Sequence, residues 1–345
     1  MTVPRMRAWN LWSRVAIAVL AFGALVPGLA AAQEKGQEVE LSDVLGAMVM
    51  VRSEVAADAR TAGSLGTRRV GSGVVIDAEG LVLTIGYLIL EAERTELVIP
   101  SGEAVEATVV GYDHDTGFGL VRAVRPLAIK PMRMGNSSDL AAGNPVVAVS
   151  IGPRPITPGI VVARRPYAGY WEYLLEDAIL TTPPHPQFGG AALVGVDGRL
   201  LGIGSLYINV AEEGQEPLPG NMFIPIDRLK PILADLIESG RSAQPQHPWL
   251  GLSTAEAGGR VLVRRVSPGG PAEKVGLKAG DVIVGVGGKR VDGLADFLRK
   301  VWAQGDPGAA IPLDVLHLDA VDLAIKRYDV PSISRYDWLK LKRDL

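Results

Sequence analysis

The chain has 345 residues, of which 48% are apolar and 21% charged, so it is long enough for two or three globular domains and is not disordered. Its formal charge of −3, with Lys and Arg dispersed along the chain, excludes a basic stripe for nucleic acid. It contains no cysteine, which excludes disulfides, catalytic thiols and thiolate metal sites, and we expect no metal or cofactor.

The first 32 residues have the pattern of a secretory signal peptide. Three arginines precede the apolar run 15–25, and three alanines end at Ala32. A membrane anchor is the alternative, but this apolar run is shorter than the roughly 20 residues needed to cross a bilayer. We therefore expect cleavage near Ala32 and a periplasmic or secreted mature chain. Since the segment carries three basic and no acidic residues, its removal shifts the formal charge from −3 to −6.

Short apolar runs alternate with Gly, Pro and Asp from residue 41 onwards, which is typical of strands joined by tight turns. The segment 74–83 predicts a hairpin in which Gly80 supplies the positive-φ turn residue. This spacing predicts a β-barrel or a β-sandwich. Further strands are expected at 109–110, 120–121, 146–151, 160–163, 192–196 and 200–203.

A helix is expected after these strands, with Gly240 as its stop, followed by a polar linker over 241–248 that holds two prolines. Five apolar residues have the spacing of one helix face: Leu229, Ile232, Leu233, Leu236 and Ile237.

The last part of the chain mixes strands and helices. A short helix is expected between Pro271 and Gly276, and an amphipathic helix over 294–302. Strands are expected at 260–266, 281–286, 311–316 and 321–328.

Several stretches resemble the HtrA/Deg family of trypsin-like serine proteases. Residues 70–80 resemble the opening of that family's first barrel, 111–116 the stretch before its catalytic aspartate, and 221–227 the close of its second barrel. The most specific match is to a PDZ domain, in the carboxylate-binding loop 249–252 and the run 267–283. The resemblance implies a mainly β fold, with a trypsin-like double β-barrel followed by a C-terminal α+β PDZ domain.

The resemblance also implies an order of parts along the chain. These are a signal peptide (1–32), a protease-like domain (41–238), a linker (239–247), a PDZ domain (248–335) and a C-terminal tail (336–345). Family members trimerise through an N-terminal segment, but 33–40 is short, charged and free of aromatic residues. Homo-oligomerisation therefore stays open.

Carried over position by position, the resemblance gives no catalytic triad. Tyr87 stands where the family has its histidine, Gly117 where it has its aspartate, and Gly189 where it has its serine. The triad needs an imidazole, a buried carboxylate and a hydroxyl, whereas a tyrosine phenol has an ordinary pKa near 10 and glycine has no side chain. Gln187 and Phe188 replace the residues before the serine, so we expect a disturbed oxyanion hole. The resemblance thus implies an inactive protease.

Two histidines are further candidates. His114 lies between two acids, which would suit a metal, but no other ligand spacing supports one, and a solvated turn is the preferred interpretation. His185 has prolines nearby and no neighbouring Ser or Cys, so it is interpreted as a loop residue rather than a catalyst.

The PDZ resemblance implies peptide binding. A PDZ domain adds a ligand strand to a sheet edge and holds its C-terminal carboxylate on backbone N–H groups. We expect a groove between the strand 260–266 and the helix 294–302, and the chain's own end, Leu345, is a candidate occupant, although a frayed tail is preferred. The expected peptide-binding residues are Trp249, Leu250, Gly251, Leu252, Leu294, Phe297, Leu298 and Val301.

The leading hypothesis is an exported HtrA-like pseudoprotease that binds peptides, unfolded segments or C-termini of envelope proteins as a chaperone, adaptor or scaffold in protein quality control. The alternative is an active serine endopeptidase in envelope protein quality control, against which no G-x-S-G-G run is present. A third hypothesis is a scaffolding subunit that assembles with an active protease homologue.

Overall fold

The structure is a computed structural model that describes residues 41–210, 216–318 and 324–341. The predicted signal segment and its cleavage site at Ala32 lie outside these residues. No helix in the described ranges is both long enough and apolar enough to cross a membrane.

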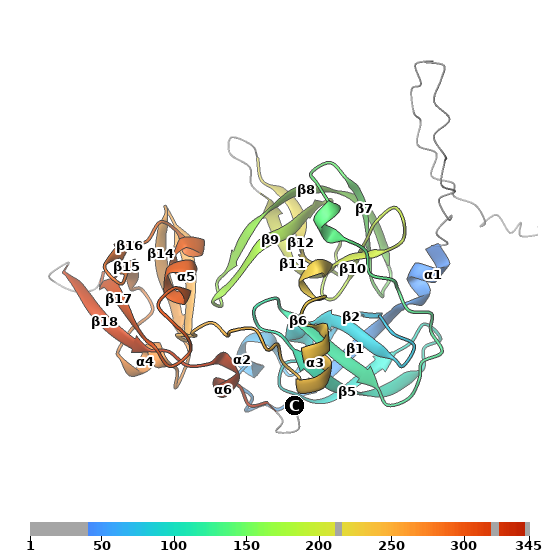
Figure 1. Cartoon of the computed structure of the whole chain (residues 1–345), viewed down its shortest axis with the longest axis horizontal. Helices are drawn as coiled ribbons and strands as arrows, with labels where there is room; N and C mark the ends of the chain where they lie inside the picture. Colours follow the sequence, from blue (N-terminus) through green and yellow to red (C-terminus); the bar gives the residue numbers. More distant parts are fainter. Residues whose placement is uncertain (1–40, 211–215, 319–323, 342–345) are drawn as a thin grey trace, which may run out of the picture. The chain divides into compact units, whose positions relative to one another are not determined.

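The protease-like part of the chain forms two closed antiparallel barrels (Figure 1). The first barrel has the order β1-β2-β3-β6-β5-β4 and the second the order β10-β11-β12-β9-β8-β7. The first consists of β1 (Met48–Val55), β2 (Arg68–Val75), β3 (Leu81–Ile85), β4 (Ala92–Val98), β5 (Ala104–Tyr112) and β6 (Phe118–Ala123). The second consists of β7 (Pro145–Val149), β8 (Ile156–Gly169), β9 (Tyr173–Thr182), β10 (Ala192–Val194), β11 (Leu200–Val210) and β12 (Leu218–Pro225).

Short helices and 3₁₀ turns connect these strands. They are α1 (Leu41–Gly46), α2 (Ala62–Leu65), η1 (Gly86–Leu88), η2 (Ser137–Asp139) and η3 (Ile226–Arg228). The hairpin predicted over 74–83 is confirmed, because Val74 pairs with Leu83 across β2 and β3 and Gly80 has a φ of +86°. This backbone conformation is one that favours glycine.

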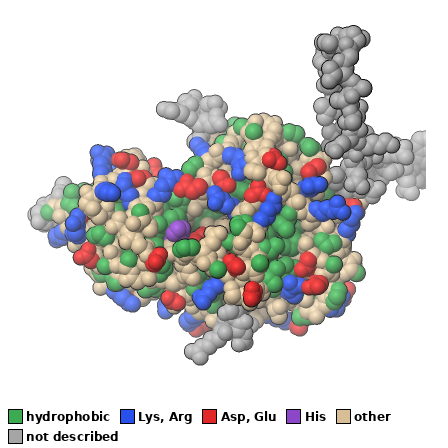
Figure 2. All heavy atoms as spheres, in the orientation of Figure 1, with side chains coloured by type: hydrophobic (Ala, Val, Ile, Leu, Met, Phe, Trp, Pro, Cys, Tyr) green, Lys and Arg blue, Asp and Glu red, His purple; other side chains and the backbone are tan. Residues whose placement is uncertain are grey.

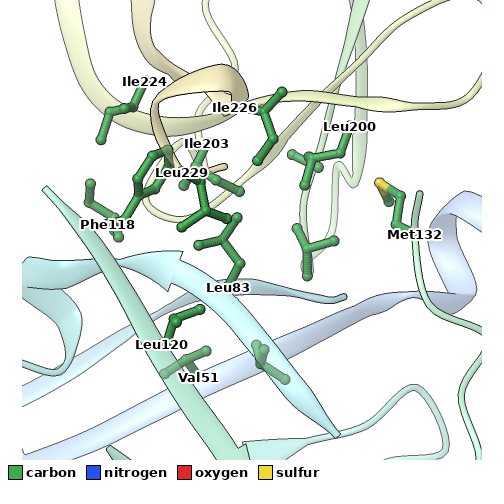
Figure 3. Close-up of a cluster of buried hydrophobic side chains, with 14 of the residues drawn as sticks. Val51, Leu83, Phe118, Leu120, Met132, Leu200, Ile203, Ile224, Ile226 and Leu229 are labelled. Atoms are coloured by element: carbon green, nitrogen blue, oxygen red, sulfur yellow. The ribbon is translucent and has the colours of Figure 1, made fainter. Parts of the chain in front are cut away.

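A single apolar core joins the two barrels. Figure 3 shows Leu83 and Phe118 of the first barrel beside Ile203 and Ile224 of the second, and all four side chains are fully buried. Because the chain has no disulfide to cross-link them, the barrels depend on this contact for their relative position.

The helix after the barrels is shorter than predicted. The α-helix α3 spans Leu233–Ser239, four residues later than expected, and ends at Gly240, which has a left-handed φ of +74°. Pro231 explains the late start, since a proline disfavours helical backbone in the residue before it. The prediction of one buried face is also wrong at Ile237, whose side chain is 43% exposed.

The C-terminal part is a sheet of order β13-β14-β15-β17-β18, with β16 paired to β15. Its strands are β13 (Leu252–Ala257), β14 (Arg260–Val266), β15 (Val282–Val286), β16 (Lys289–Arg290), β17 (Ala310–Leu316) and β18 (Ile325–Pro331). Its helices are α4 (Pro271–Lys274), α5 (Leu294–Trp302) and α6 (Arg335–Trp338). The short helix after Pro271 and the amphipathic helix over 294–302 are confirmed, whereas the start predicted for the last strand at 321 lies outside the described residues.

Charges of both signs are interspersed over the face drawn in Figure 2. Cross-strand ion pairs are present among the described residues, such as Arg52 with Glu96 at 3.2 Å and Arg327 with Asp314 at 2.8 Å. Exposed pairs of this kind contribute little to stability. The fold therefore depends on its apolar cores rather than on its surface charges.

We predict that Phe118→Ala destabilises the protein by about 3–5 kcal/mol, because it leaves a cavity in the core between the barrels. Urea unfolding followed by circular dichroism measures this change. Val124→Ala is the matched control, since Val124 is 61% exposed, and it should change the free energy of unfolding by less than about 0.5 kcal/mol. Equal effects of the two substitutions would contradict this account of the core.

Candidate functional site

The structure brings the three positions of the degenerate triad together. A Cβ atom added to Gly189 would lie 2.9 Å from the Tyr87 hydroxyl oxygen. That hydroxyl donates a hydrogen bond to the Ser205 carbonyl at 3.0 Å. The Gly86 N–H, next to Tyr87, donates to the Gly117 carbonyl at 2.7 Å. The Tyr87 side chain therefore fills the space that a side chain at position 189 would need.

The electrostatics of these positions do not suit proton transfer. Burial raises the pKa of the Tyr87 phenol well above its ordinary value, so the group stays protonated at neutral pH. Gly117 has a φ of +86°, and a Cβ atom there would lie 3.4 Å from the Ile224 side chain and 3.7 Å from the Tyr173 ring. An aspartate at 117 would combine a disfavoured backbone with an apolar surrounding.

The loop before β10 is held by its main chain. The Ser72 N–H donates to the Gly189 carbonyl at 2.8 Å, and a Cβ atom on Gly190 would lie only 1.9 Å from the Ser72 carbonyl oxygen. Among the described residues, the non-glycine positions with positive φ are Glu91, Ala128 and Glu172. Gln187 and Phe188 thus do not have the left-handed backbone that glycine would allow.

His185 has a serine partner that sequence reasoning missed. Its Nε2 lies 2.7 Å from the Ser150 hydroxyl and its Nδ1 lies 2.8 Å from the Thr157 hydroxyl. The neighbours of His185 in the sequence do not indicate this partner, because it comes from 35 residues away. Both His185 and Ser150 are fully buried, and burial lowers the pKa of His185. A neutral imidazole between two hydroxyls, with no exposed atom, has the features of a structural hydrogen-bond network.

His114 does not lie in a solvated turn, contrary to the prediction. Its Nδ1 lies 3.0 Å from the Tyr112 hydroxyl, and its Nε2 lies 3.0 Å from a guanidinium nitrogen of Arg335. Burial lowers the pKa of His114 well below its ordinary value, and the charge of Arg335 adds to this effect. Residues from α6 cover this turn, which local sequence could not indicate. Within the described ranges no group of three acidic or histidine side chains could hold a metal ion.

The predicted carboxylate loop of the PDZ domain holds a carboxylate from the same chain. The N–H of Leu250 donates to Glu172 Oε2 at 2.8 Å, and the N–H of Leu252 donates to Glu172 Oε1 at 2.7 Å. Glu172 lies in the turn between β8 and β9 of the second barrel and is buried. Burial raises the pKa of Glu172 to about 7, against the lowering effect of these hydrogen bonds and of Arg335.

The edge strand of the sheet beside this loop is β13 rather than the predicted strand 260–266. That strand, β14, is internal to the sheet because β13 and β15 flank it, whereas β13 forms the edge. Leu174 of β9 belongs to the buried cluster that contains the loop and the inner face of α5. The other members of this cluster include Leu250, Leu252, Leu294, Phe297, Leu298 and Val301.

The β8–β9 hairpin makes two further contacts with the PDZ domain, and Figure 1 shows its tip beside α5. The N–H of Thr254 on β13 donates to the Tyr170 carbonyl at 2.9 Å. Arg299 on α5 forms two hydrogen bonds with the Glu176 carboxylate, at 2.8 and 2.6 Å. Neither Glu172 nor Leu174 was among the expected site residues, and no local sequence signal distinguishes them.

The C-terminal tail follows the first barrel as far as it is described. The ring of Trp338 lies 4.8 Å from that of Trp249, which is itself buried. The Lys340 N–H donates to the Glu91 carboxylate at 2.8 Å. The described part of the tail is thus held by Trp249 and Glu91, and the expected occupant Leu345 lies outside the described residues.

A cavity of about 550 Å³ lies between the degenerate triad and the PDZ loop. Tyr87, Gly117 and Phe188 form part of one wall, and Leu252 and Ser267 form part of another. Among the described residues, its lining includes no acid, but it includes eight aromatic side chains. The positively charged residues that line it are Arg60, Arg265 and Arg335.

Comparisons with known proteins agree with this architecture. The family described as trypsin-like peptidase domain matches residues 71–203, and the family described as PDZ domain matches residues 248–326. Serine endoprotease DegS of Escherichia coli strain K12 is 29% identical over 275 residues, which cover 73% of this chain and 74% of that protein. Serine protease Do-like HtrA of Bacillus subtilis is 28% identical over 279 residues, which cover 71% of this chain but only 60% of that protein.

Among solved structures, the HtrA-type protease AlgW with a decapeptide matches with a TM-score of 0.50 and 20% identity. The match covers 88% of this chain and 100% of that chain, and it shows the fold alone. The mainly β fold with a trypsin-like double barrel and a PDZ domain is thus confirmed.

We predict that Gly189→Ser destabilises the protein by about 1–3 kcal/mol, because the new side chain clashes with the Tyr87 hydroxyl. The double variant Gly189→Ser, Tyr87→Ala lacks this clash. Its loss of stability should therefore be smaller than the sum of the losses in the two single variants. Urea unfolding of the wild type, the two single variants and the double variant measures the free energies of unfolding. Gly63→Ser serves as the control, since a Cβ atom at Gly63 would meet nothing within 4 Å. Strict additivity would show that Tyr87 does not occupy this space in solution.

Proposed function

We propose that this chain, which combines a trypsin-like peptidase domain with a PDZ domain and has HtrA and DegS proteases as homologues, binds peptides rather than cleaving them. Its ligands would be C-termini or unfolded segments of envelope proteins, held in a chaperone, adaptor or scaffold role. The signal pattern of residues 1–32 supports a periplasmic or secreted location.

The position of the Tyr87 hydroxyl carries this proposal. It lies where a side chain on residue 189 would be, and it already donates a hydrogen bond to the Ser205 carbonyl. Serine proteases need a hydroxyl nucleophile that an imidazole deprotonates and a carboxylate orients. The positions 87, 117 and 189 supply none of these three groups, which supports a role other than acyl transfer.

Two features support binding. The N–H groups of Leu250 and Leu252 already hold a carboxylate, which is the interaction that a PDZ domain makes with the C-terminus of a peptide. The cavity beside the loop combines aromatic and basic side chains, which suit an extended peptide with a negative charge. A scaffolding subunit that assembles with an active protease homologue would use the same surfaces.

The alternative is an active serine endopeptidase in envelope protein quality control. One observation favours it, because the Ser150 hydroxyl lies 2.7 Å from His185 Nε2, within the distance of a nucleophile and its base. A substrate carbonyl could approach Ser150 only after the second barrel had opened, since both side chains are fully buried. We therefore favour peptide binding.

The purified protein should not cleave denatured casein, and a fluorophosphonate probe should label no serine. Serine proteases that lose triad members keep roughly 10³–10⁴-fold catalysis over water when the oxyanion hole and substrate binding are intact. Because we expect a disturbed oxyanion hole in this chain, this remaining catalysis should also be lost. Gly189→Ser should also remain unlabelled, because a serine without a base is a weak nucleophile. An active HtrA protease is the positive control. Labelling of Ser150 together with casein turnover would establish the alternative.

A peptide that ends in an apolar residue with a free carboxylate should bind the full-length protein at micromolar strength, about −8 kcal/mol. Gly251→Leu should abolish binding, because Gly251 has a φ of +82° and a Cβ atom there would lie 3.3 Å from the Trp249 ring. Gly258→Leu is the matched control, since Gly258 also has a positive φ, of +58°, but a Cβ atom there would meet nothing within 4 Å. Equal titration curves for the two variants would remove the loop from the proposal.

A further inference from the structure

The turn between β8 and β9 is built around a glutamate in an unfavourable backbone conformation. Residues 170–172 connect the two strands, and Glu172 has a φ of +59°. Three-residue hairpin turns usually place glycine at the left-handed position, because a Cβ atom is disfavoured there. Backbone strain of this kind persists where surrounding contacts hold it. The contacts that hold Glu172 are those of its carboxylate with the PDZ domain.

Those contacts have the pattern of a bound C-terminus. Each oxygen of the Glu172 carboxylate accepts one main-chain N–H, from Leu250 and from Leu252. Charge-assisted bonds of this type are stronger than those between neutral groups. A PDZ loop holds the terminal carboxylate of a peptide with the same groups. The two carboxylates therefore cannot occupy the loop together.

The chain around Glu172 provides the other two elements of a PDZ ligand. The Tyr170 carbonyl accepts from the Thr254 N–H, which is a main-chain contact at the edge strand β13. The Leu174 side chain is buried among the apolar residues of the loop and of α5. A carboxylate, a strand-edge hydrogen bond and an apolar anchor thus come from one hairpin tip.

We propose that the β8–β9 hairpin is the resident ligand of the PDZ groove, and that a peptide C-terminus binds by displacing the Glu172 carboxylate from the loop. The displacement step rests on the proposed peptide binding. The external ligand must supply what the hairpin supplies, namely a free carboxylate and an apolar side chain close to it. A peptide with an amidated C-terminus lacks the first and does not compete.

Displacement of the Glu172 carboxylate also affects the surroundings of Tyr87 and Gly117, because residues next to Glu172 in the hairpin contact that part of the molecule. Tyr173 follows Glu172 and donates from its hydroxyl to the Thr116 carbonyl at 2.8 Å, next to Gly117. The Trp171 carbonyl accepts from Arg335 at 3.0 Å. Trp171, Tyr173 and Arg335 all line the cavity of 550 Å³. A peptide at the PDZ loop therefore changes the wall of this cavity.

An internal ligand weakens the binding of any competitor. The apparent dissociation constant equals the intrinsic one divided by the fraction of molecules whose groove is free. Glu172→Gly removes the carboxylate and suits the left-handed backbone of the turn, so the hairpin remains able to form. This variant should bind the free-carboxylate peptide about tenfold more tightly than the wild type. Glu172→Gln, whose amide nitrogen cannot accept an N–H, should shift the affinity in the same direction.

The experiment titrates the full-length protein with the peptide and measures hydrogen exchange by mass spectrometry. Ala128→Gly is the matched control, because Ala128 also has a positive φ, of +53°, but is exposed in the segment between β6 and β7. Its affinity for the peptide should equal that of the wild type. Adding the peptide to the wild type should accelerate exchange at residues 169–175, and the amidated peptide should leave it unchanged.

The outcomes separate this inference from the proposed function. Equal affinities of wild type, Glu172→Gly and Glu172→Gln, with unchanged exchange at 169–175, would overturn the resident ligand and leave peptide binding intact. If no variant binds the peptide, but exchange at 250–252 is faster in Glu172→Gly than in Ala128→Gly, the hairpin is the resident ligand. That second result would overturn the proposed peptide binding.

Discussion

Main-chain N–H groups gathered around buried carboxylates join distant parts of this chain. Glu172 joins the second barrel to the PDZ loop through Leu250 and Leu252. Glu91 plays a similar part, since its carboxylate accepts the N–H groups of Arg60 and Lys340 at 3.1 and 2.8 Å. Both acids have a φ of +59°. In a chain without cysteine, these hydrogen bonds add to the apolar packing that joins distant segments, as Leu174 does beside Glu172.

The three positions that the resemblance aligns with a catalytic triad, Tyr87, Gly117 and Gly189, form a packed arrangement in their own right. Tyr87 and Gly189 are complementary in volume, since the phenol of one occupies the space that the other leaves open. The hydrogen bond from Tyr87 to the Ser205 carbonyl satisfies the buried hydroxyl, which would otherwise destabilise the fold. Gly117 completes the arrangement by leaving room for the Ile224 and Tyr173 side chains.

Features that depend on neighbouring residues could be predicted from the sequence. The hairpin at Gly80 and the buried face of α5 follow from turn chemistry and helical spacing. Contacts between distant residues could not. Leu250 is 78 residues from Glu172, and Ser150 is 35 residues from His185, and no local pattern relates the members of either pair. The family resemblance therefore implied the loop that holds a carboxylate, but not which carboxylate it holds.

The complementarity of Tyr87 and Gly189 has an evolutionary consequence. A lineage that carries both residues cannot acquire a serine at 189 by a harmless single substitution, because Tyr87 must first be replaced. Replacing Tyr87 first leaves a void and removes a satisfied hydrogen bond, with no gain of activity to compensate. Both routes pass through a less stable intermediate. The packing of these two positions thus disfavours a serine at 189 for as long as Tyr87 is present.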